Sequence, residues 1–211
     1  MDLLAPDVAQ LLDRLVPDRP DVMLQMEQRA RDTAFPIIGP AAGHFCYLVA
    51  RLIHARRIFE LGSGYGYSTA WFARAVRENG GGEVYHTVWN EALARDARHY
   101  LDALGWSDVV RFESGESVER LRAAKGPFDL IFNDIDKSGY PASLDVIEAK
   151  LRPGGVLIVD NALWGGRVFQ EEDRSANTEG VREITRRLTT DPKWTATIVP
   201  IRDGLLFAHF T

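Results

Sequence analysis

Cysteine is almost missing from this 211-residue sequence, in which Cys46 is the only one. A lone cysteine cannot form a disulfide within the chain, which is typical of a reducing compartment. Long apolar runs are missing too, because no stretch approaches the ~20 residues that a membrane-spanning helix needs. Acids and prolines fill the start of the chain in place of a basic segment and an apolar run, so we expect no signal peptide. These absences predict a cytoplasmic protein without a membrane partner.

Excess positive charge and regularly spaced histidines are also lacking. The chain has 25 basic and 30 acidic residues, which gives a net charge of −5 and no basic footprint for nucleic acid. Its five histidines are scattered, and neither histidine nor cysteine accompanies the acidic motifs described below, which argues against a zinc site. The apolar content of 45% is ordinary for a globular protein, and we predict one domain over residues 1–211.

Helical patterns fill the first quarter of the chain. Three helices are expected, over 6–16, 21–32 and 41–54. The third pattern places Leu48, Leu52 and Ile53 on one side of its helix. Cys46 lies in the same apolar pattern, so we interpret it as a core residue rather than a nucleophile.

Short apolar segments alternate with amphipathic helical patterns from residue 57 onward. Seven strands are predicted, over 57–62, 83–88, 109–114, 129–134, 155–161, 195–201 and 204–210. Five helices are predicted between them, near 67–79, 91–104, 116–124, 139–151 and 178–190. Apolar strands that alternate with helices indicate a parallel sheet covered on both faces. Only "RDG" separates the last two strands, which is typical of a hairpin. The fold class is therefore α/β: a doubly wound, mostly parallel seven-stranded sheet with one antiparallel terminal strand.

Three glycines mark the turn between the first strand and the next helix, in "ELGSGYGYST". Glycines allow a tight turn and a close approach of a ligand, beside a helix N-terminus that favours negative charge. A dinucleotide fingerprint reads G-x-G-x-x-G, whereas Tyr67 stands at the third glycine position here. Glu60, at the end of the strand, suits an ammonium group better than a pyrophosphate. The pattern favours an amino-acid-bearing nucleoside, and a nicotinamide-dependent oxidoreductase is the alternative of a different class.

Acidic and amide side chains follow two other strands, in "FNDIDKSGY" and "IVDN". The carboxyl ends of parallel strands face one crevice, so Asp134, Asp160 and Asn161 are expected to converge. Oxygen donors of this kind suit Mg²⁺. The alternative is that these residues only cap turns, and that Lys137 is a surface lysine paired with Asp136.

In order and spacing, the motifs resemble those of class I S-adenosylmethionine-dependent methyltransferases, and more narrowly the metal-dependent O-methyltransferases of the catechol and caffeoyl-CoA type. The matching stretches are "FELGSGYGYST", "FDLIFNDIDKSGY", "LRPGGVLIVDNALWGGRV" and "VPIRDGLLFAHF". The resemblance covers residues 35–211 as the catalytic core and implies a Rossmann-like methyltransferase fold. Residues 1–34 would then be an N-terminal helical cover that helps to build a homodimer. The implied reaction is methyl transfer to a hydroxyl of a small catechol-like or phenolic acceptor with Mg²⁺ assistance.

The resemblance also implies roles for individual residues. Positions that hold S-adenosylmethionine fall on Glu60, Gly62, Ser63, Gly64, Ser68, Ser117, Asp134, Asp136 and Tyr140. Metal ligands fall on Asp134, Asp160 and Asn161, and Lys137 takes the place of the family's catalytic base beside Asp134. Trp164, in the long connection that follows, is expected either to stack on an aromatic acceptor or to anchor the loop.

One position departs from the family pattern. The second strand of such proteins usually ends in an acid that holds the ribose of the cofactor, and Val88 stands there in "VYHTVWNEA". Asn90 or Glu91 is the candidate replacement, so Val88 and Asn90 are included in the predicted cofactor region. A protein that binds S-adenosylmethionine without turning it over is a further alternative.

Overall fold

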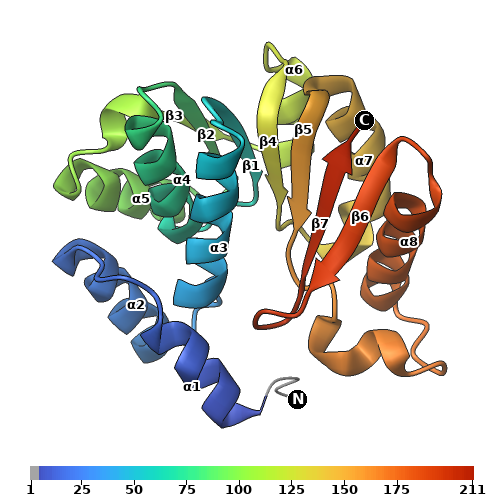
Figure 1. The fold of residues 1–211 in the computed structure, drawn as a ribbon. Coiled ribbons are helices and arrows are strands. Elements are labelled where there is room, and N and C mark those ends of the chain that lie inside the picture. Colours follow the sequence, from blue (N-terminus) through green and yellow to red (C-terminus); the bar gives the residue numbers. More distant parts are fainter. Residues whose placement is uncertain (1–4) are drawn as a thin grey trace.

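A seven-stranded sheet runs through the middle of the molecule in the computed structural model, which describes residues 5–211 (Figure 1). The strands are β1 Arg57–Leu61, β2 Glu83–Val88, β3 Val110–Ser114, β4 Phe128–Asn133, β5 Leu151–Val159, β6 Trp194–Val199 and β7 Leu205–Phe210. They lie in the order β3-β2-β1-β4-β5-β7-β6. Neighbouring strands are parallel except at β7, which runs antiparallel to both β5 and β6. The predicted fold class is confirmed, and the reversed strand lies inside the sheet rather than at its edge.

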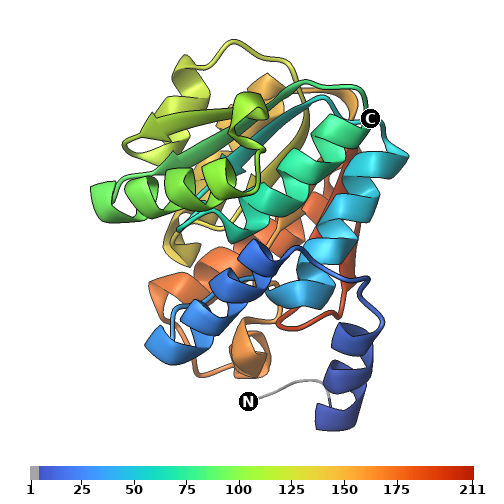
Figure 2. The same cartoon turned by 90° about the vertical axis from the view of Figure 1, so that its left-hand side faces the viewer.

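Helices cover both faces of the sheet (Figure 1 and Figure 2). One layer holds α3 Gly39–Leu52, α4 Tyr67–Glu78 and α5 Glu91–Ala103, with α1 Pro6–Arg14 and α2 Asp21–Thr33 packed against it. The other layer holds α6 Ser117–Ala123, α7 Tyr140–Lys150 and α8 Ala176–Thr190. Short 3₁₀ turns lie at η1 Ser107–Val109, η2 Lys137–Gly139 and η3 Trp164–Phe169.

Each face of the sheet has its own hydrophobic core, because successive strand residues point to opposite faces. Ile58 on β1 and Phe132 on β4 pack toward α3 and α4. Their neighbours Phe59 and Ile131 pack toward α6, α7 and α8. All four side chains are fully buried. The central strands are thereby fixed from both sides, and so are the loops at their carboxyl ends.

The buried side of α3 consists of small residues. A Cβ on Gly43 would lie 2.2 Å from Nε1 of Trp71, so α3 approaches α4 closely at a position that only glycine fits. Cys46 is fully buried on this side, as predicted. Leu48 and Leu52 are 44% and 77% exposed. The side of α3 that carries these leucines therefore faces outward, because the close packing of α3 on α4 leaves no room for large side chains between them.

Several boundaries differ from the prediction. β5 begins at Leu151 instead of residue 155, since the Pro-Gly-Gly segment is part of the strand, with a register shift against β4 and a φ of +71° at Gly154. Residues 200–204 join β6 to β7, a longer connection than the three-residue "RDG". The connection after β5 contains η3, and α8 begins two residues before the predicted start. Within residues 5–211, no helix combines the length and the apolar character needed to cross a membrane.

Candidate active site

A cavity of about 940 Å³ opens at the carboxyl ends of the parallel strands. The glycine-rich turn after β1, the loop after β4, the end of β5 and residues 35–38 bound it. Its walls include the following sequence-predicted residues: Gly62, Ser63, Gly64, Ser68, Val88, Ser117, Asp134, Asp136, Lys137, Asp160, Asn161 and Trp164. Glu60, Asn90 and Tyr140 are not among its lining residues. The fold thus brings the glycine turn and both acidic motifs to one place.

The glycine-rich turn packs directly on the loop that carries the first acid. Gly62 has a φ of +86°, and a Cβ there would lie 2.4 Å from the carbonyl oxygen of Asp134. The backbone N–H of Asp134 donates to the carbonyl of Leu61 at 2.8 Å. Glycine is needed at residue 62 for both its conformation and this contact. The wall that bears the glycines and the wall that bears the acids therefore meet.

Glu60 lies beneath the turn and is fully buried. Its Oε2 accepts a hydrogen bond from the Thr69 hydroxyl, which also contacts Nδ1 of the buried His86 at 3.0 Å. Within the described residues, its Oε1 has no hydrogen-bond partner. Burial raises the pKa of Glu60 to about 7, against the opposing effect of nearby hydroxyls. An unpaired buried carboxylate oxygen is a group that a cationic ligand would satisfy.

A network of hydroxyls joins the glycine turn to the end of β2 and the start of α6. The backbone N–H of Thr87 donates to the Ser63 hydroxyl at 2.9 Å, and the Ser63 N–H donates to the Thr87 carbonyl at 2.9 Å. The Thr87 hydroxyl contacts the Ser117 hydroxyl at 3.0 Å. These bonds fix Ser63 and Ser117 on the cavity wall.

The end of β2 presents an apolar wall where the family usually has an acid. Val88 is almost buried and lines the cavity, and the next residue, Trp89, lines it while 79% exposed. The Asn90 side chain is engaged elsewhere, because its Oδ1 accepts the N–H groups of Ala92 and Leu93 at the start of α5. Asn90 is therefore an N-cap in this structure.

Asp134 and Lys137 form an ion pair at the acidic end of the cavity. Nζ of Lys137 donates to Oδ1 of Asp134 at 2.8 Å and to the carbonyl of Ile135 at 3.3 Å. The ammonium group also lies 5.4 Å from the ring centre of Tyr140 and 5.8 Å from that of Trp164. Burial raises the pKa of Asp134, and the charge of Lys137 opposes this rise. Lys137 is held at the cavity wall instead of pointing into solvent.

Asp160 is the more deeply buried of the two acids. Its Oδ2 accepts a hydrogen bond from Nη1 of Arg202 at 3.2 Å, and its carbonyl accepts one from the Tyr140 hydroxyl at 3.0 Å. Burial and the charge of Asp134 raise the pKa of Asp160 to about 7. Tyr140 thus holds the backbone of Asp160 in place but does not itself line the cavity.

Asn161 is held by the loop between β6 and β7. Its Nδ2 donates to Oδ2 of Asp203 at 3.1 Å, and Oδ1 of Asp203 accepts the N–H of Gly165 at 2.7 Å. Because the amide nitrogen meets Asp203, the amide oxygen of Asn161 faces the other way. Asp203 therefore orients a predicted metal ligand without lining the cavity itself.

Comparison with known families decides the assignment. The family model described as O-methyltransferase matches residues 18–210. The chain belongs to the O-methyltransferase family. This assignment confirms the predicted enzyme class and excludes the oxidoreductase alternative.

Individual relatives of this O-methyltransferase agree with the family model. A catechol O-methyltransferase of Niastella koreensis is 30% identical over 185 residues, which cover 85% of this chain and 83% of the relative. The O-methyltransferase TomG of Streptomyces achromogenes, solved with S-adenosylmethionine (SAM), has a TM-score of 0.86 at 29% identity and covers 97% of this chain and 96% of its own. An O-methyltransferase of Bacillus cereus, solved with S-adenosylhomocysteine (SAH), has a TM-score of 0.87 at 27% identity and 97% coverage of both chains.

The donor atoms of this O-methyltransferase fit a hard divalent cation. Asp134 and Asp160 supply carboxylate oxygens and Asn161 an amide oxygen, which are the ligands that Mg²⁺ prefers. Within residues 5–211, no three His, Cys, Asp or Glu side chains are placed to hold a metal ion together, so the amide oxygen would be the third protein donor. Two cationic side chains, Lys137 and Arg202, already contact the carboxylates.

Sequence reasoning missed several residues that shape the site. Arg202, Asp203, Trp89 and the segment 35–38 reach or support the cavity from distant parts of the chain. The pattern in "VPIRDGL" predicts a hairpin, but it does not indicate that the charged residues of this loop contact the end of β5. Only Trp89 had a local signal, because it stands next to the position of the missing acid.

Proposed function

We propose that this O-methyltransferase uses SAM to methylate a hydroxyl of a small catechol-like or phenolic acceptor with the assistance of Mg²⁺. The observation that carries the proposal is one continuous cavity, which runs from the glycine-rich turn to the end formed by Asp134, Asp160 and Asn161. The contact between Gly62 and Asp134 supports the proposal, because the glycine-rich turn lies directly beside the acidic end. The SAM and SAH complexes of the similar structures support this choice of cofactor.

The cavity offers a distinct environment for each part of the cofactor. Ser68 lines the cavity in the first turn of α4 and suits a carboxylate. Glu60 does not line the cavity but adjoins the lining hydroxyls of Ser63 and Ser68, so its unpaired oxygen suits an ammonium group that reaches past them. Trp89 offers a flat apolar surface for the adenine ring. At Val88 the ribose would meet an apolar side chain, so binding relies on the two ends of the cofactor.

The acidic end would hold the metal through Asp134, Asp160 and Asn161. A bound divalent cation supplies a positive charge that lowers the pKa of a coordinated phenol. Lys137 lies beside Asp134 and would accept the phenolic proton as the neutral amine, after its own proton has passed to solvent. Trp164 borders the same space, where it would align an aromatic acceptor.

Activity and binding together test the proposal. Purified protein with SAM and catechol should form a methylated product, lose this activity with EDTA and recover it with Mg²⁺. Asp160→Ala should abolish turnover, whereas Asp145→Ala should not, because Asp145 is a surface acid on α7 with a 78% exposed side chain. Activity that is insensitive to both EDTA and Asp160→Ala would refute the metal role.

Calorimetry separates the remaining alternative. Binding of SAM and SAH without turnover of any phenolic acceptor would favour the non-catalytic protein, which Val88 and the capping role of Asn90 make a specific alternative. Absence of SAM binding would refute both.

We also propose a homodimer that pairs the N-terminal layer of two copies. The helix α1 buries none of its side chains and exposes Val8 and Leu11, and the 69% exposed Leu15 follows it directly. It packs against the N-terminal end of α3, where the N–H of Ala41 donates to Asp13. Light scattering should give twice the chain mass. Leu15→Glu should give the monomer, and Phe169→Glu, an equally exposed apolar position on η3, should remain dimeric. A monomeric wild type would refute this proposal.

A further inference from the structure

Two cationic side chains neutralise the two carboxylates at the acidic end. Lys137 contacts Asp134 at 2.8 Å, and Arg202 contacts Asp160 at 3.2 Å. When both carboxylates are ionised, the four charges cancel, so the site is balanced before a divalent cation arrives. A cation that binds there must meet two resident positive charges, and at least one of them has to give way.

Three of these four side chains are less exposed than the fourth. The side chain of Asp160 is 3% exposed, and the Tyr140 hydroxyl holds the carbonyl of the same residue. The side chain of Lys137 is 12% exposed and donates to a backbone carbonyl as well as to Asp134. The side chain of Asp134 is 26% exposed, and its backbone N–H donates to the carbonyl of Leu61 at the end of β1.

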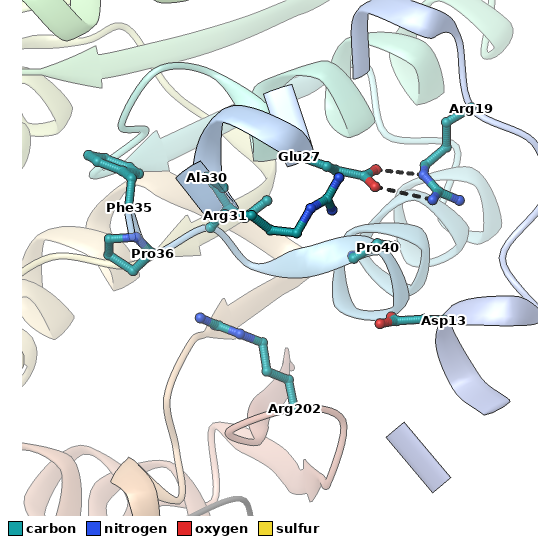
Figure 3. Close-up of a pocket in the computed structure, with 10 residues that line it drawn as sticks. Asp13, Arg19, Glu27, Ala30, Arg31, Phe35, Pro36, Pro40 and Arg202 are labelled. Atoms are coloured by element: carbon teal, nitrogen blue, oxygen red, sulfur yellow. Dashed lines mark hydrogen bonds and ion pairs between the residues drawn. The ribbon is translucent and has the colours of Figure 1, made fainter. Parts of the chain in front are cut away.

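Arg202 is the exception. Its side chain is 36% exposed and borders both the main cavity and a second opening of about 470 Å³ next to it. Figure 3 shows the side chain extending from the β6–β7 loop toward the segment that carries Arg31, Phe35 and Pro36. The guanidinium therefore has a water-accessible space into which it can turn.

The loop backbone can stay in place while this side chain moves. The next residue, Asp203, is tied to Asn161 and to the N–H of Gly165. Arg202 itself has a φ of +55°, so its direction toward Asp160 depends on a conformation that this anchored loop imposes. Movement of Arg202 away from Asp160 thus leaves the orientation of Asn161 intact.

We propose that Arg202 competes with the divalent cation for Asp160. Its guanidinium holds the carboxylate in the metal-free protein and turns into the adjoining opening when the cation binds. Arg202 consequently sets the cation concentration at which the site fills. The inference rests on the metal site of the proposed function, and it adds to that site an internal competitor.

Direct metal binding tests the competition without reference to turnover. The free Mn²⁺ signal in electron paramagnetic resonance gives the Kd of the wild type and of three variants. Arg202→Gln should bind Mn²⁺ about tenfold more tightly or better, because a hydrogen bond between charged groups no longer has to be broken. Arg202→Lys keeps the charge and should stay within about threefold of the wild type. Arg31→Gln should do the same, since Arg31 is an exposed arginine of the same opening that hydrogen-bonds Gln28 instead of a carboxylate.

Thermal unfolding adds a second readout. Without metal, Arg202→Gln should melt below the wild type because Asp160 is left buried without its cation, and saturating Mn²⁺ should raise its Tm more than that of the wild type. Equal or weaker Mn²⁺ binding by Arg202→Gln would overturn the inference and leave the proposed function standing. Absence of Mn²⁺ binding in every variant would overturn the inference together with the metal part of the proposed function, whereas calorimetry with SAM would still report on the cofactor site.

Discussion

The contact between Gly62 and Asp134 makes a quantitative prediction, because the chain contains a matched control for it. Gly62 and Gly80 have φ values of +86° and +91°, so alanine suffers the same backbone strain at both. A Cβ on Gly80 meets no atom of the described chain within 4 Å, whereas one on Gly62 lies 2.4 Å from the Asp134 carbonyl oxygen and 2.9 Å from its carbon. The difference between the two variants isolates the contact.

The expected magnitudes follow from these two terms. Alanine in the left-handed region costs about 1–2 kcal/mol, so Gly80→Ala should lower the free energy of unfolding by that amount. Gly62→Ala should lower it by about 1–3 kcal/mol more, because a backbone carbonyl in a packed core must move. Urea unfolding should show both losses as shifts of the midpoint at an unchanged m-value.

The same pair of variants links the fold to the site. Gly62→Ala displaces the backbone of Asp134, so it should also weaken Mn²⁺ and SAM binding, and Gly80→Ala should leave both unchanged. Equal destabilisation by the two substitutions would refute the reasoning, because it would mean that the Gly62 contact relaxes without resistance.

Three further predictions concern buried charges. Because burial raises the pKa of Glu60 to about 7, only about a tenth of this carboxyl group is charged at pH 6. SAM affinity measured by calorimetry should therefore rise about tenfold from pH 6 to pH 8 in the wild type and stay flat in Glu60→Gln. An equal pH dependence in both proteins would contradict a role of Glu60 in binding the ammonium group of SAM. Asp203→Ala frees Asn161 and should weaken Mn²⁺ binding about 10–100-fold, with an unchanged Kd as the contrary result. Arg19→Met leaves the buried Glu27 without its 2.6 Å ion pair and should lower the free energy of unfolding by about 3 kcal/mol in urea titrations. The double variant Arg19→Met, Glu27→Gln should recover most of this loss, and no recovery would show that the loss comes from packing.

The sheet and the convergence of the acids were predictable because both follow from local pattern. Alternating apolar strands and helices imply a parallel sheet, and parallel strands bring their carboxyl ends to one edge. Asp134 and Asp160 therefore had to lie near the glycine turn, even though 26 residues separate them in sequence.

The remaining features depend on tertiary contacts that no local pattern encodes. Arg202 contacts Asp160 only because β7 inserts between β5 and β6 and carries its loop to the end of β5. The leucines of α3 suggest that their side of the helix is buried, but this side is exposed. The opposite side is buried, because Gly43 lets Trp71 of α4 approach closely. The cap at Asn90 was likewise hidden, because a residue considered for the ribose is equally suited to start a helix.

The position of β7 has a consequence for the order in which the molecule assembles. β7 follows β6 in the sequence but separates it from β5, so β6 has no place in the sheet until β7 has been synthesised. A growing chain can complete the cofactor half, from β1 to β5, while the outer edge of β5 is still open to association with other chains. Arg202 and Asp203 reach the acidic end only when this edge closes. The glycine turn and the loop after β4 can therefore be synthesised before Asp160 and Asn161 gain their partners Arg202 and Asp203.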